Sequence, residues 1–405
     1  MKRLTLPTRY ETAIRVLKDI SRRHGWFLEN LTAKKLANLL IAGAEFGLKR
    51  EEMSAWPVMI KVDISPLCNL RCPTCVHAFP GDNSPALLKR QSFSARQRMP
   101  LENFQKIVSE VSGKTMALSL YYLGDPLIHP DLVAICRAAW RGGLNTHIST
   151  NFSFDLSDHQ ISELIDSGLT HLTVCVDGLT AGTYERTRVG GRLQVVLDNL
   201  ERLMALRRGK QSTYPKVEVQ FIKFQHNVHE LESALQRFHA LGVDQVTDYW
   251  GALHNYVDRS AEMYSVGAPK ANKWLPQCLW PHFSMLIKWD GEVIPCCTHR
   301  HADQYAQDGD TRGVGNVFQT SIRDIWNGPE YRRLRRMAAN PEKVGEDPSL
   351  REMFCDRCPA LFETTIESVK RKGNTTRWED LYVFDSKGRA VRRQETLPEV
   401  VRGAS

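Results

Sequence analysis

Three cysteines, Cys68, Cys72 and Cys75, stand at the spacing CxxxCxxC and are the residues of this sequence best suited to chemistry. Three thiolates on one short loop can each bind one iron of a 4Fe–4S cluster, whereas an ordinary cluster of this type takes four cysteines. The fourth iron then remains open to a ligand that the protein does not supply. The spacing therefore predicts an iron–sulfur site with a free coordination position.

A structural zinc ion is the alternative for the same motif. Such an ion usually takes four ligands, and His77, close after Cys75, could be the fourth. The position of the motif favours the cluster, because it directly follows the first predicted strand of a βα series. Active sites of βα barrels are built at the C-terminal ends of the strands.

A second group of cysteines lies late in the chain. Two of them flank a predicted hairpin whose turn is Asp290-Gly291, and the other two form a CxxC pair; the four are Cys278, Cys296, Cys355 and Cys358. Four thiolates can close around one metal centre, which could be an iron–sulfur cluster or zinc. Neighbouring residues on a strand point to opposite faces, so Cys296 and Cys297 are not both expected to bind the same centre.

The composition narrows the class of protein. The chain has 405 residues, a net charge of +8 and ten cysteines, with no apolar run long enough for a transmembrane helix and no signal peptide. We therefore expect a cytoplasmic protein, in which cysteines serve metal binding or catalysis. Cys136 and Cys175 are expected to pack in the core. The arginine-rich segment 332–336 looks like an amphipathic helix, so nucleic-acid binding is not expected.

The elements that position the first motif follow a βα pattern. Short apolar runs alternate with helix-period segments, and the predicted strands are 58–64, 116–124, 144–150, 171–177, 216–224 and 245–250. Six such repeats are too few for an eight-fold barrel, so we predict an open, partial (β/α)6 barrel of the α/β class over residues 57–265.

Three further parts flank this barrel. Residues 1–56 are predicted to form a helical extension whose apolar face, with Leu36, Leu39, Leu40 and Ala44, packs against its own domain in preference to a membrane surface. Residues 266–365 are predicted to form a small α+β domain that holds the second cysteine group. Residues 366–405 form a polar tail.

The segment DISPLCNLRCPTC resembles the opening motif of the radical S-adenosylmethionine (SAM) superfamily, and the likeness extends over roughly residues 58–360. The resemblance implies that SAM chelates the open iron and is cleaved reductively to a 5′-deoxyadenosyl radical. YYLGDPLIHPDL resembles the family's Gly-Gly-Glu-Pro segment, with Leu and Asp in place of the first Gly and the Glu. HISTN and VCVDGLTAGTYERTRVGG resemble further SAM-binding segments. The implied SAM-binding residues are Gly124, Asp125, Pro126, Ser149, Asn151 and Arg188.

The order of the late cysteines is similar to the shortened SPASM domain called Twitch. The resemblance implies one auxiliary 4Fe–4S cluster, held by Cys278, Cys296, Cys355 and Cys358. Cys296 fits the family position, so Cys297 is predicted to be a buried small residue. Together with the first cluster this gives two clusters, with SAM as the third cofactor. Because four protein ligands leave no open iron, the auxiliary cluster is expected to transfer electrons.

The reaction is expected to be a radical oxidation, dehydration or epimerisation of a sugar, aminocyclitol or other small polyol, as in similar dehydrogenases. Modification of a peptide or protein side chain is the alternative, and a non-catalytic metal-stabilised scaffold is a third hypothesis. A flavodoxin- or ferredoxin-like protein is the expected electron donor. Candidates for contact with the substrate lie at the end of the sixth strand, at Asp248, Tyr249 and Trp250.

Overall fold

The structure is a computed structural model of the whole chain. It describes residues 28–72, 75, 77, 93–224, 226–250, 265–271, 274–297, 313–351, 353–356, 358, 360–365, 382–384 and 390–392. Most of the predicted helical extension before residue 28 and most of the tail after residue 365 lie outside these ranges.

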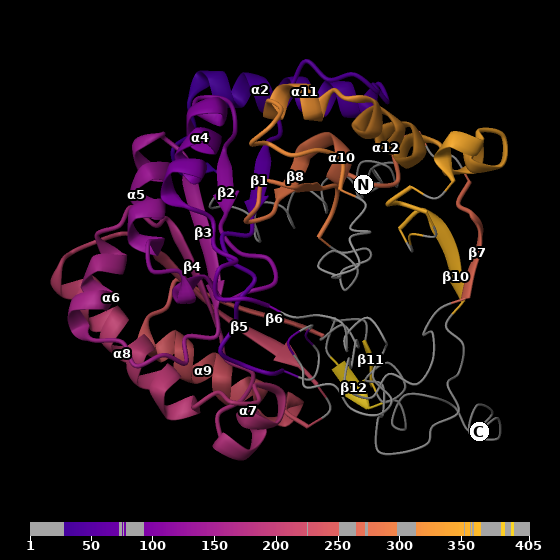
Figure 1. Cartoon of the computed structure of the whole chain (residues 1–405). Coiled ribbons are helices and arrows are strands. Elements are labelled where there is room, and N and C mark those ends of the chain that lie inside the picture. Colours follow the sequence, from indigo (N-terminus) through magenta and orange to yellow (C-terminus); the bar gives the residue numbers. More distant parts are fainter. Residues whose placement is uncertain are drawn as a thin grey trace, which may run out of the picture.

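The strands and their connecting helices alternate along the first two thirds of the chain (Figure 1). The strands are β1 (Met59–Val62), β2 (Ala117–Ser119), β3 (Asn145–Thr150), β4 (His171–Cys175), β5 (Lys216–Lys223) and β6 (Gln245–Trp250). The helices among them are α4 (Leu101–Val111), α5 (Leu132–Arg141), α6 (Asp158–Ile165), α7 (Ala181–Thr187), α8 (Leu193–Gly209) and α9 (Leu231–Leu241). Each of the six predicted strands is therefore confirmed.

One curved sheet runs through the molecule in the order β6-β5-β4-β3-β2-β1-β8-β9. All pairs from β6 to β1 are parallel, and β8 (Ser284–Ile287) adds to the free edge of β1, also in parallel. The partial barrel of the α/β class is confirmed. The hairpin of the later segment extends this same sheet, so hydrogen bonds cross the predicted domain boundary at residue 265, which itself stays a prediction.

The two faces of the sheet differ in chemistry. The helices cover its outer face (Figure 1), and there Val217, Val219 and Phe221 of β5 are fully buried in the apolar core. The intervening Glu218 and Gln220 are only half-buried and face inward. A parallel strand covered on both faces by apolar layers would instead be continuously hydrophobic.

Helix α2 (Ala33–Gly47) exists as predicted, but its buried face is not the predicted one. Leu36 and Leu40 are 41% and 64% exposed, whereas Lys35 and Asn38 are buried. The Asn38 amide exchanges hydrogen bonds with both backbone groups of Trp56, because residues 48–56 form turns that fold back along the helix. The need to pair these backbone groups, and not the burial of apolar side chains, decides which face of α2 turns inward.

The predicted hairpin is confirmed as β8 and β9 (Val293–Ile294), with Gly291 at a φ of 87° in its turn. A Cβ at Gly291 would lie 2.4 Å from the Phe318 ring, so glycine is required there. The later segment continues through α10 (Trp280–Phe283), α11 (Ile322–Trp326) and α12 (Pro329–Ala339). Two small antiparallel pairs complete the described elements: β7 (Ser265–Pro269) with β10 (Phe362–Thr365), and β11 (Tyr382–Phe384) with β12 (Ala390–Arg392).

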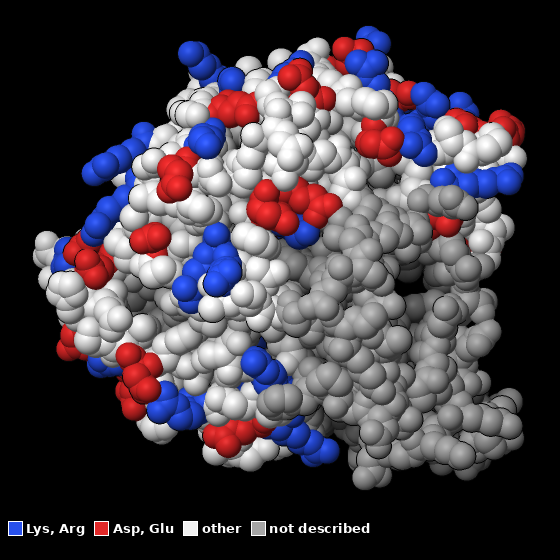
Figure 2. Space-filling model, viewed as in Figure 1, with Lys and Arg blue, Asp and Glu red and all other residues white. Residues whose placement is uncertain are grey.

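The arginines of α12 are all engaged within the chain. Arg332 pairs with Glu52, Arg333 with Glu330, and Arg336 with Glu51 and Asp347. Arg335 is completely buried. Figure 2 shows acidic and basic side chains interspersed on the visible face, with no large basic field over this helix.

No helix within the described ranges combines the length and the apolar character needed to span a membrane.

Candidate functional site

The first cysteine motif follows β1 directly, at the C-terminal end of the strand. Cys72 is buried, Cys68 and Cys75 are half-buried, and the Cys75 amide donates to the Cys72 carbonyl at 3.0 Å, which forms a tight turn. Burial raises the pKa of Cys68 well above its usual value, and the nearby Asp125 carboxylate, Cys75 and Cys72 raise it further. The three thiols are therefore close enough to influence one another's ionisation, as ligands of one cluster must be.

A single zinc ion is the alternative occupant of this motif. Among the described residues, no three His, Cys, Asp or Glu side chains are placed to share one metal ion. His77, the alternative fourth zinc ligand, is buried and its Nε2 lies 3.2 Å from the Leu123 carbonyl oxygen.

The loop after β2 lies against the backbone that leads into Cys68. A Cβ at Gly124 would lie 2.1 Å from the Ser65 carbonyl oxygen and 2.5 Å from that of Leu67. The Asp125 amide donates to the Leu67 carbonyl at 2.7 Å. Only glycine permits this close approach, so Gly124 fixes the two loops together.

The Asp125 side chain is buried and ties the ends of β2 and β3 together. Its carboxylate accepts bonds from the Thr150 hydroxyl at 2.9 Å and from the amides of Asn151 and Leu127. Burial raises the pKa of this carboxyl to about 6, although these hydrogen bonds oppose the rise. Pro126 begins the short 3-10 helix η2 (Pro126–Ile128), which Asp125 caps.

The two predicted polar residues at the end of β3 occupy different surroundings. The Asn151 amide nitrogen lies 3.9 Å from the Cys68 sulfur and donates to the Asn69 side chain at 2.8 Å. The Ser149 hydroxyl lies 3.5 Å from the Cys175 sulfur. The structure thus brings Asn151 to the first cysteine loop, while Ser149 faces the interior of the barrel.

Arg188, at the end of α7, is an almost buried cation beside the Asp177 carboxylate and the Cys72 thiol. Its Nε donates to Asp177 at 2.6 Å, and its side chain also hydrogen-bonds the Cys72 thiol. The guanidinium therefore adjoins the cysteine loop. Its bond to Asp177 occupies one of the donors that a SAM carboxylate would otherwise use.

The inward face of the strands encloses a cavity of about 330 Å³, which we call the lumen. Every strand from β1 to β6 contributes to its wall, and most of the lining side chains are polar. The lining residues are Met59, Lys61, Ser119, Tyr121, His147, Thr173, Glu218, Gln220, Gln245, Val246, Thr247, Asp248, Tyr249, Trp280 and Cys297.

A hydrogen-bond network crosses the wall of the lumen around Glu218. This carboxylate accepts bonds from His171 Nε2 at 3.0 Å, from Thr173 at 3.1 Å and from Thr247. Although burial opposes ionisation, these donors hold the pKa of Glu218 below its usual value. The Thr173 hydroxyl has one proton, which it donates to Glu218. The Thr173 oxygen must therefore accept the hydrogen bond from His147 Nε2, 2.8 Å away, so this ring nitrogen is the protonated one.

Of the three predicted substrate contacts, Asp248 and Tyr249 line the lumen, and both have partners. Asp248 pairs with Lys223, and the Tyr249 hydroxyl donates to Gln220 at 2.8 Å. Trp250 ends β6, and its side chain lies outside the described part of the molecule.

Cys175 is buried, as expected, but its sulfur has polar neighbours. It alternates with Val174 and faces the lumen side, where its sulfur contacts Ser149 and Gln220. Cys136 does belong to the apolar core.

Sequence reasoning missed Lys61, Tyr121, His147 and Glu218. The signal was present in the alternation of polar and apolar residues over the first six positions of β5, KVEVQF, which indicates that one face of a parallel strand lines a polar interior.

The late cysteines are brought together from three segments. Cys296 is buried after β9, and the Cys358 amide donates to the Cys355 carbonyl at 3.2 Å in a tight turn. Burial raises the pKa of Cys278 to about 11, and the neighbouring Cys358 thiol raises it further. Cys278 and Cys358 are thus close in space although 80 positions separate them in the sequence.

Cys297 departs from its predicted place. It is half-buried and lines the lumen instead of filling the core. Its thiol lies near Lys61 and Tyr121, because it contributes to the pKa shifts of both. The divergence of Cys296 and Cys297 agrees with the opposite directions expected for neighbouring residues.

A compact aromatic and cationic group supports the late cysteines. The Arg335 guanidinium stacks 4.4 Å from the centre of the Trp326 ring and donates to the carbonyls of Pro281, Glu51 and Trp326. Tyr331 packs against Trp326, and both Cys296 and Cys355 contribute to the pKa shift of its phenol. This group, Trp326, Tyr331 and Arg335, packs within the apolar core of the segment, to which Ile322, Leu334 and Met337 also belong.

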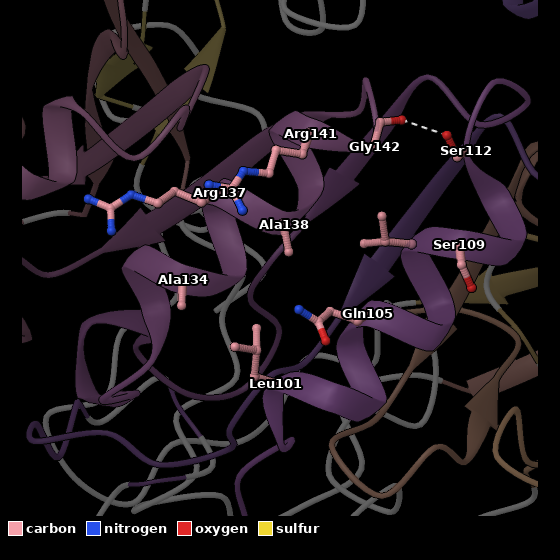
Figure 3. A pocket seen from close by; sticks show the side chains of 10 residues that line it. Leu101, Gln105, Ser109, Ser112, Ala134, Arg137, Ala138, Arg141 and Gly142 are labelled. Carbon is pink, nitrogen blue, oxygen red and sulfur yellow. Dashed lines mark hydrogen bonds between the residues drawn. The ribbon is translucent and has the colours of Figure 1, made fainter.

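A second hollow, of about 500 Å³, lies between α4 and α5 on the outer helical layer (Figure 3). The methyl-bearing side chains of Val108, Ala134 and Ala138 line it, and the Arg137 guanidinium points away from it. It contains none of the cysteines and none of the lumen residues. The lumen is therefore the better candidate for substrate.

Two family models match the chain. The radical SAM superfamily matches residues 62–214, and the SPASM iron–sulfur cluster-binding domain matches residues 278–359. The first match spans the Cys68 loop and strands β3 and β4, and the second spans all four late cysteines.

Similar proteins cover most of both regions. The tungsten-containing aldehyde ferredoxin oxidoreductase cofactor-modifying protein of Pyrococcus furiosus is 24% identical over 310 residues, which is 69% of this chain and 83% of that protein. The PqqA peptide cyclase of Rhodopseudomonas palustris is 24% identical over 316 residues, 69% of this chain and 76% of that protein. Among solved structures, Streptococcus suis SuiB bound to SAM shares the fold with a TM-score of 0.53 at 14% identity, covering 74% and 72% of the two chains.

The two matched domains bring SAM and two iron–sulfur clusters as cofactors, and the two cysteine groups of this chain provide chemically suitable donors for them. The zinc scaffold hypothesis loses its basis, because the motif, the fold and the partial barrel agree with a catalytic family. The chain belongs to the radical SAM superfamily and is a radical SAM enzyme with a C-terminal SPASM-type iron–sulfur domain.

Proposed function

We propose that this enzyme modifies a side chain of a peptide or protein by radical chemistry. The observation that carries the proposal is the similarity to PqqA peptide cyclase, which extends over 69% of this chain and 76% of that protein. That relative, by its name, acts on a peptide. The comparisons thus favour the alternative reading of the sequence over the sugar or polyol reading.

A small polyol remains the second candidate because of one structural observation. The lumen is lined by amide, hydroxyl and imidazole groups, including Gln220, Gln245, Thr247 and His147. Such groups suit a ligand with several hydroxyls. They suit an inserted polar side chain equally well, so the lumen alone does not choose between the two substrates.

We assign the cofactors to residues as follows. Cys68, Cys72 and Cys75 hold the first cluster, and Cys278, Cys296, Cys355 and Cys358 hold the auxiliary one. When bound, the first cluster supplies the electron that cleaves SAM to a 5′-deoxyadenosyl radical. Gly124, Asp125 and Pro126 shape the methionine site through their backbone, and Ser149, Asn151 and Arg188 border it.

The chain's own groups then position the substrate. The network around Glu218 fixes the tautomer of His147 and so presents a defined surface to the lumen. The Lys223–Asp248 pair and the Tyr249–Gln220 bond brace the open edge at β6. Trp280 and Cys297 of the SPASM segment form part of the lumen wall. An auxiliary cluster in this segment would therefore lie near the substrate and exchange an electron with it.

We also propose that the protein works in the cytoplasm with a flavodoxin- or ferredoxin-like donor, since its cysteines must remain reduced. The proposed parts are residues 1–56, the barrel at 57–265, the SPASM segment at 266–365 and the tail at 366–405.

The test uses anaerobically reconstituted full-length protein with dithionite and SAM, and mass spectrometry of 5′-deoxyadenosine. Low-molecular-weight fractions from an extract of the source organism are screened for stimulation of this product. A stimulating fraction is then divided into a sample treated with proteinase K and a sample treated with periodate.

Loss of stimulation after proteinase K, with survival of periodate, is the expected result for a peptide. Survival of proteinase K with loss after periodate, which cleaves vicinal diols, would replace the peptide by a polyol. The triple variant Cys68→Ala, Cys72→Ala, Cys75→Ala is the control for product formed without the first cluster.

A further inference from the structure

The lumen contains a cation whose charge no acidic group of the described chain pairs at salt-bridge distance. Lys61, at the inward face of β1, lines the lumen and holds its Nζ 4.0 Å from the centre of the Tyr121 ring. This cation–π contact orients the ammonium. The aromatic ring does not replace the oxygen acceptors that the three N–H donors of the ammonium would otherwise bind.

The other charged groups around the lumen are already matched. Glu218 is held by His171, and Asp248 pairs with Lys223. Deeper at the SAM end, Arg188 pairs with Asp177. Each of these groups thus has a close polar partner within the wall, whereas the close contact of Lys61 is with the Tyr121 ring.

The ammonium keeps its proton in this place. Burial opposes the charge, but Tyr121, Cys297 and Asp63 hold the pKa of Lys61 above its usual value. A half-buried ammonium that has an aromatic ring in place of an oxygen acceptor would favour an anionic ligand at this position.

We propose that Lys61 binds a carboxylate of the substrate inside the lumen. The inference deepens the proposed function: on a peptide substrate the group would be an acidic side chain or the terminal carboxylate. A lumen of about 330 Å³ has room for a group of this size beside the Tyr121 ring. Phosphate shares the anionic chemistry, and the experiment distinguishes it.

The test measures binding without turnover, by calorimetric titration of the reconstituted, SAM-loaded full-length protein. Glutarate serves as the carboxylate probe, glutaramide as its uncharged counterpart, and inorganic phosphate as the competing anion. The variants are Lys61→Met and Lys61→Arg. Lys114→Met is the matched control, because Lys114 also lies over an aromatic ring, Trp56 at 3.7 Å, but outside the lumen.

We expect glutarate to bind the wild type and Lys114→Met equally, and glutaramide to bind neither. Loss of a charge-assisted bond should weaken glutarate binding to Lys61→Met by roughly 10- to 100-fold. Lys61→Arg, which keeps the charge, should stay within about 5-fold of the wild type.

Equal glutarate affinity for the wild type and Lys61→Met would overturn the proposal, as would the absence of glutarate binding to the wild type. If the wild type bound phosphate and not glutarate, and Lys61→Met no longer bound phosphate, the carboxylate assignment would be overturned. Lys61 would then belong to a site for phosphate. The outcome is independent of the proteinase K test, so a failed carboxylate site and a failed peptide substrate give different results.

Discussion

The two cysteine sites of this enzyme are built in opposite ways. The first site occupies one loop of eight residues at the end of β1, and the loops after β2 and β3 lie against it through Gly124 and Asn151. The second site collects cysteines from three segments between residues 278 and 358, with Arg335 and its aromatic neighbours between them. A local motif needs close backbone contact to hold its shape, whereas a dispersed site needs a packed interior to bring its parts together.

The largest expected effect separates the two sites completely. The triple variant Cys68→Ala, Cys72→Ala, Cys75→Ala should lose all 5′-deoxyadenosine formation and about four of the about eight irons that two 4Fe–4S clusters contain. Iron and sulfide analysis with electron paramagnetic resonance would measure this. Loss of all iron would show that the auxiliary site depends on the first, contrary to the separate construction described above.

Arg335→Met should damage the dispersed site selectively. The variant leaves three buried carbonyls without their donor, and each such group costs about 1–3 kcal/mol, so we expect a loss of about 3 kcal/mol or more in stability. Thermal unfolding and auxiliary-cluster content, measured in the triple cysteine variant, would report it. Arg332→Met, which removes a half-exposed surface pair with Glu52, is the control and should change stability by less than about 1 kcal/mol. Equal effects of the two variants would contradict the role of Arg335.

Gly124→Ala should damage the local site selectively. The new Cβ would meet the Ser65 carbonyl at 2.1 Å, so the two loops must separate. First-cluster content and 5′-deoxyadenosine yield should fall at least about 10-fold, since displacing a positioning contact by ~1 Å can cost far more. The auxiliary cluster should persist.

Gly182→Ala is the matched control for that variant. Gly182 lies in α7 with no atom within 4 Å of its Cβ position, and the change should raise stability by about 0.5–1 kcal/mol. A normal first cluster in Gly124→Ala would show that the close contact of the loops is dispensable.

The smallest effect is expected for Cys297→Ser. Cys297 lines the lumen, so iron content should match the wild type, while Cys296→Ser should lose the auxiliary cluster. If iron analysis showed loss of the auxiliary cluster in Cys297→Ser and not in Cys296→Ser, then Cys297 would be the ligand and Cys296 would not.

The sequence predicted the strands well because each is a short apolar run between clear turns, and it found the first motif because all of its ligands are neighbours. It misjudged α2, where Asn38 is buried to satisfy the backbone of Trp56. It predicted the burial of Cys175 but not its contacts with Ser149 and Gln220, since a single buried strand does not reveal which of its faces meets helices and which meets the lumen.

By itself the sequence determined the radical SAM motif, the order of the six parallel strands and the hairpin at Gly291, because each depends on residues close together in the chain. The tertiary structure decided that β8 joins the edge of β1, that Lys61 and Glu218 face one lumen, and that Cys297 belongs to its wall. These facts depend on contacts between distant segments, whose geometry follows from the curvature of the whole sheet and from the packing around Arg335. Local patterns do not contain that information.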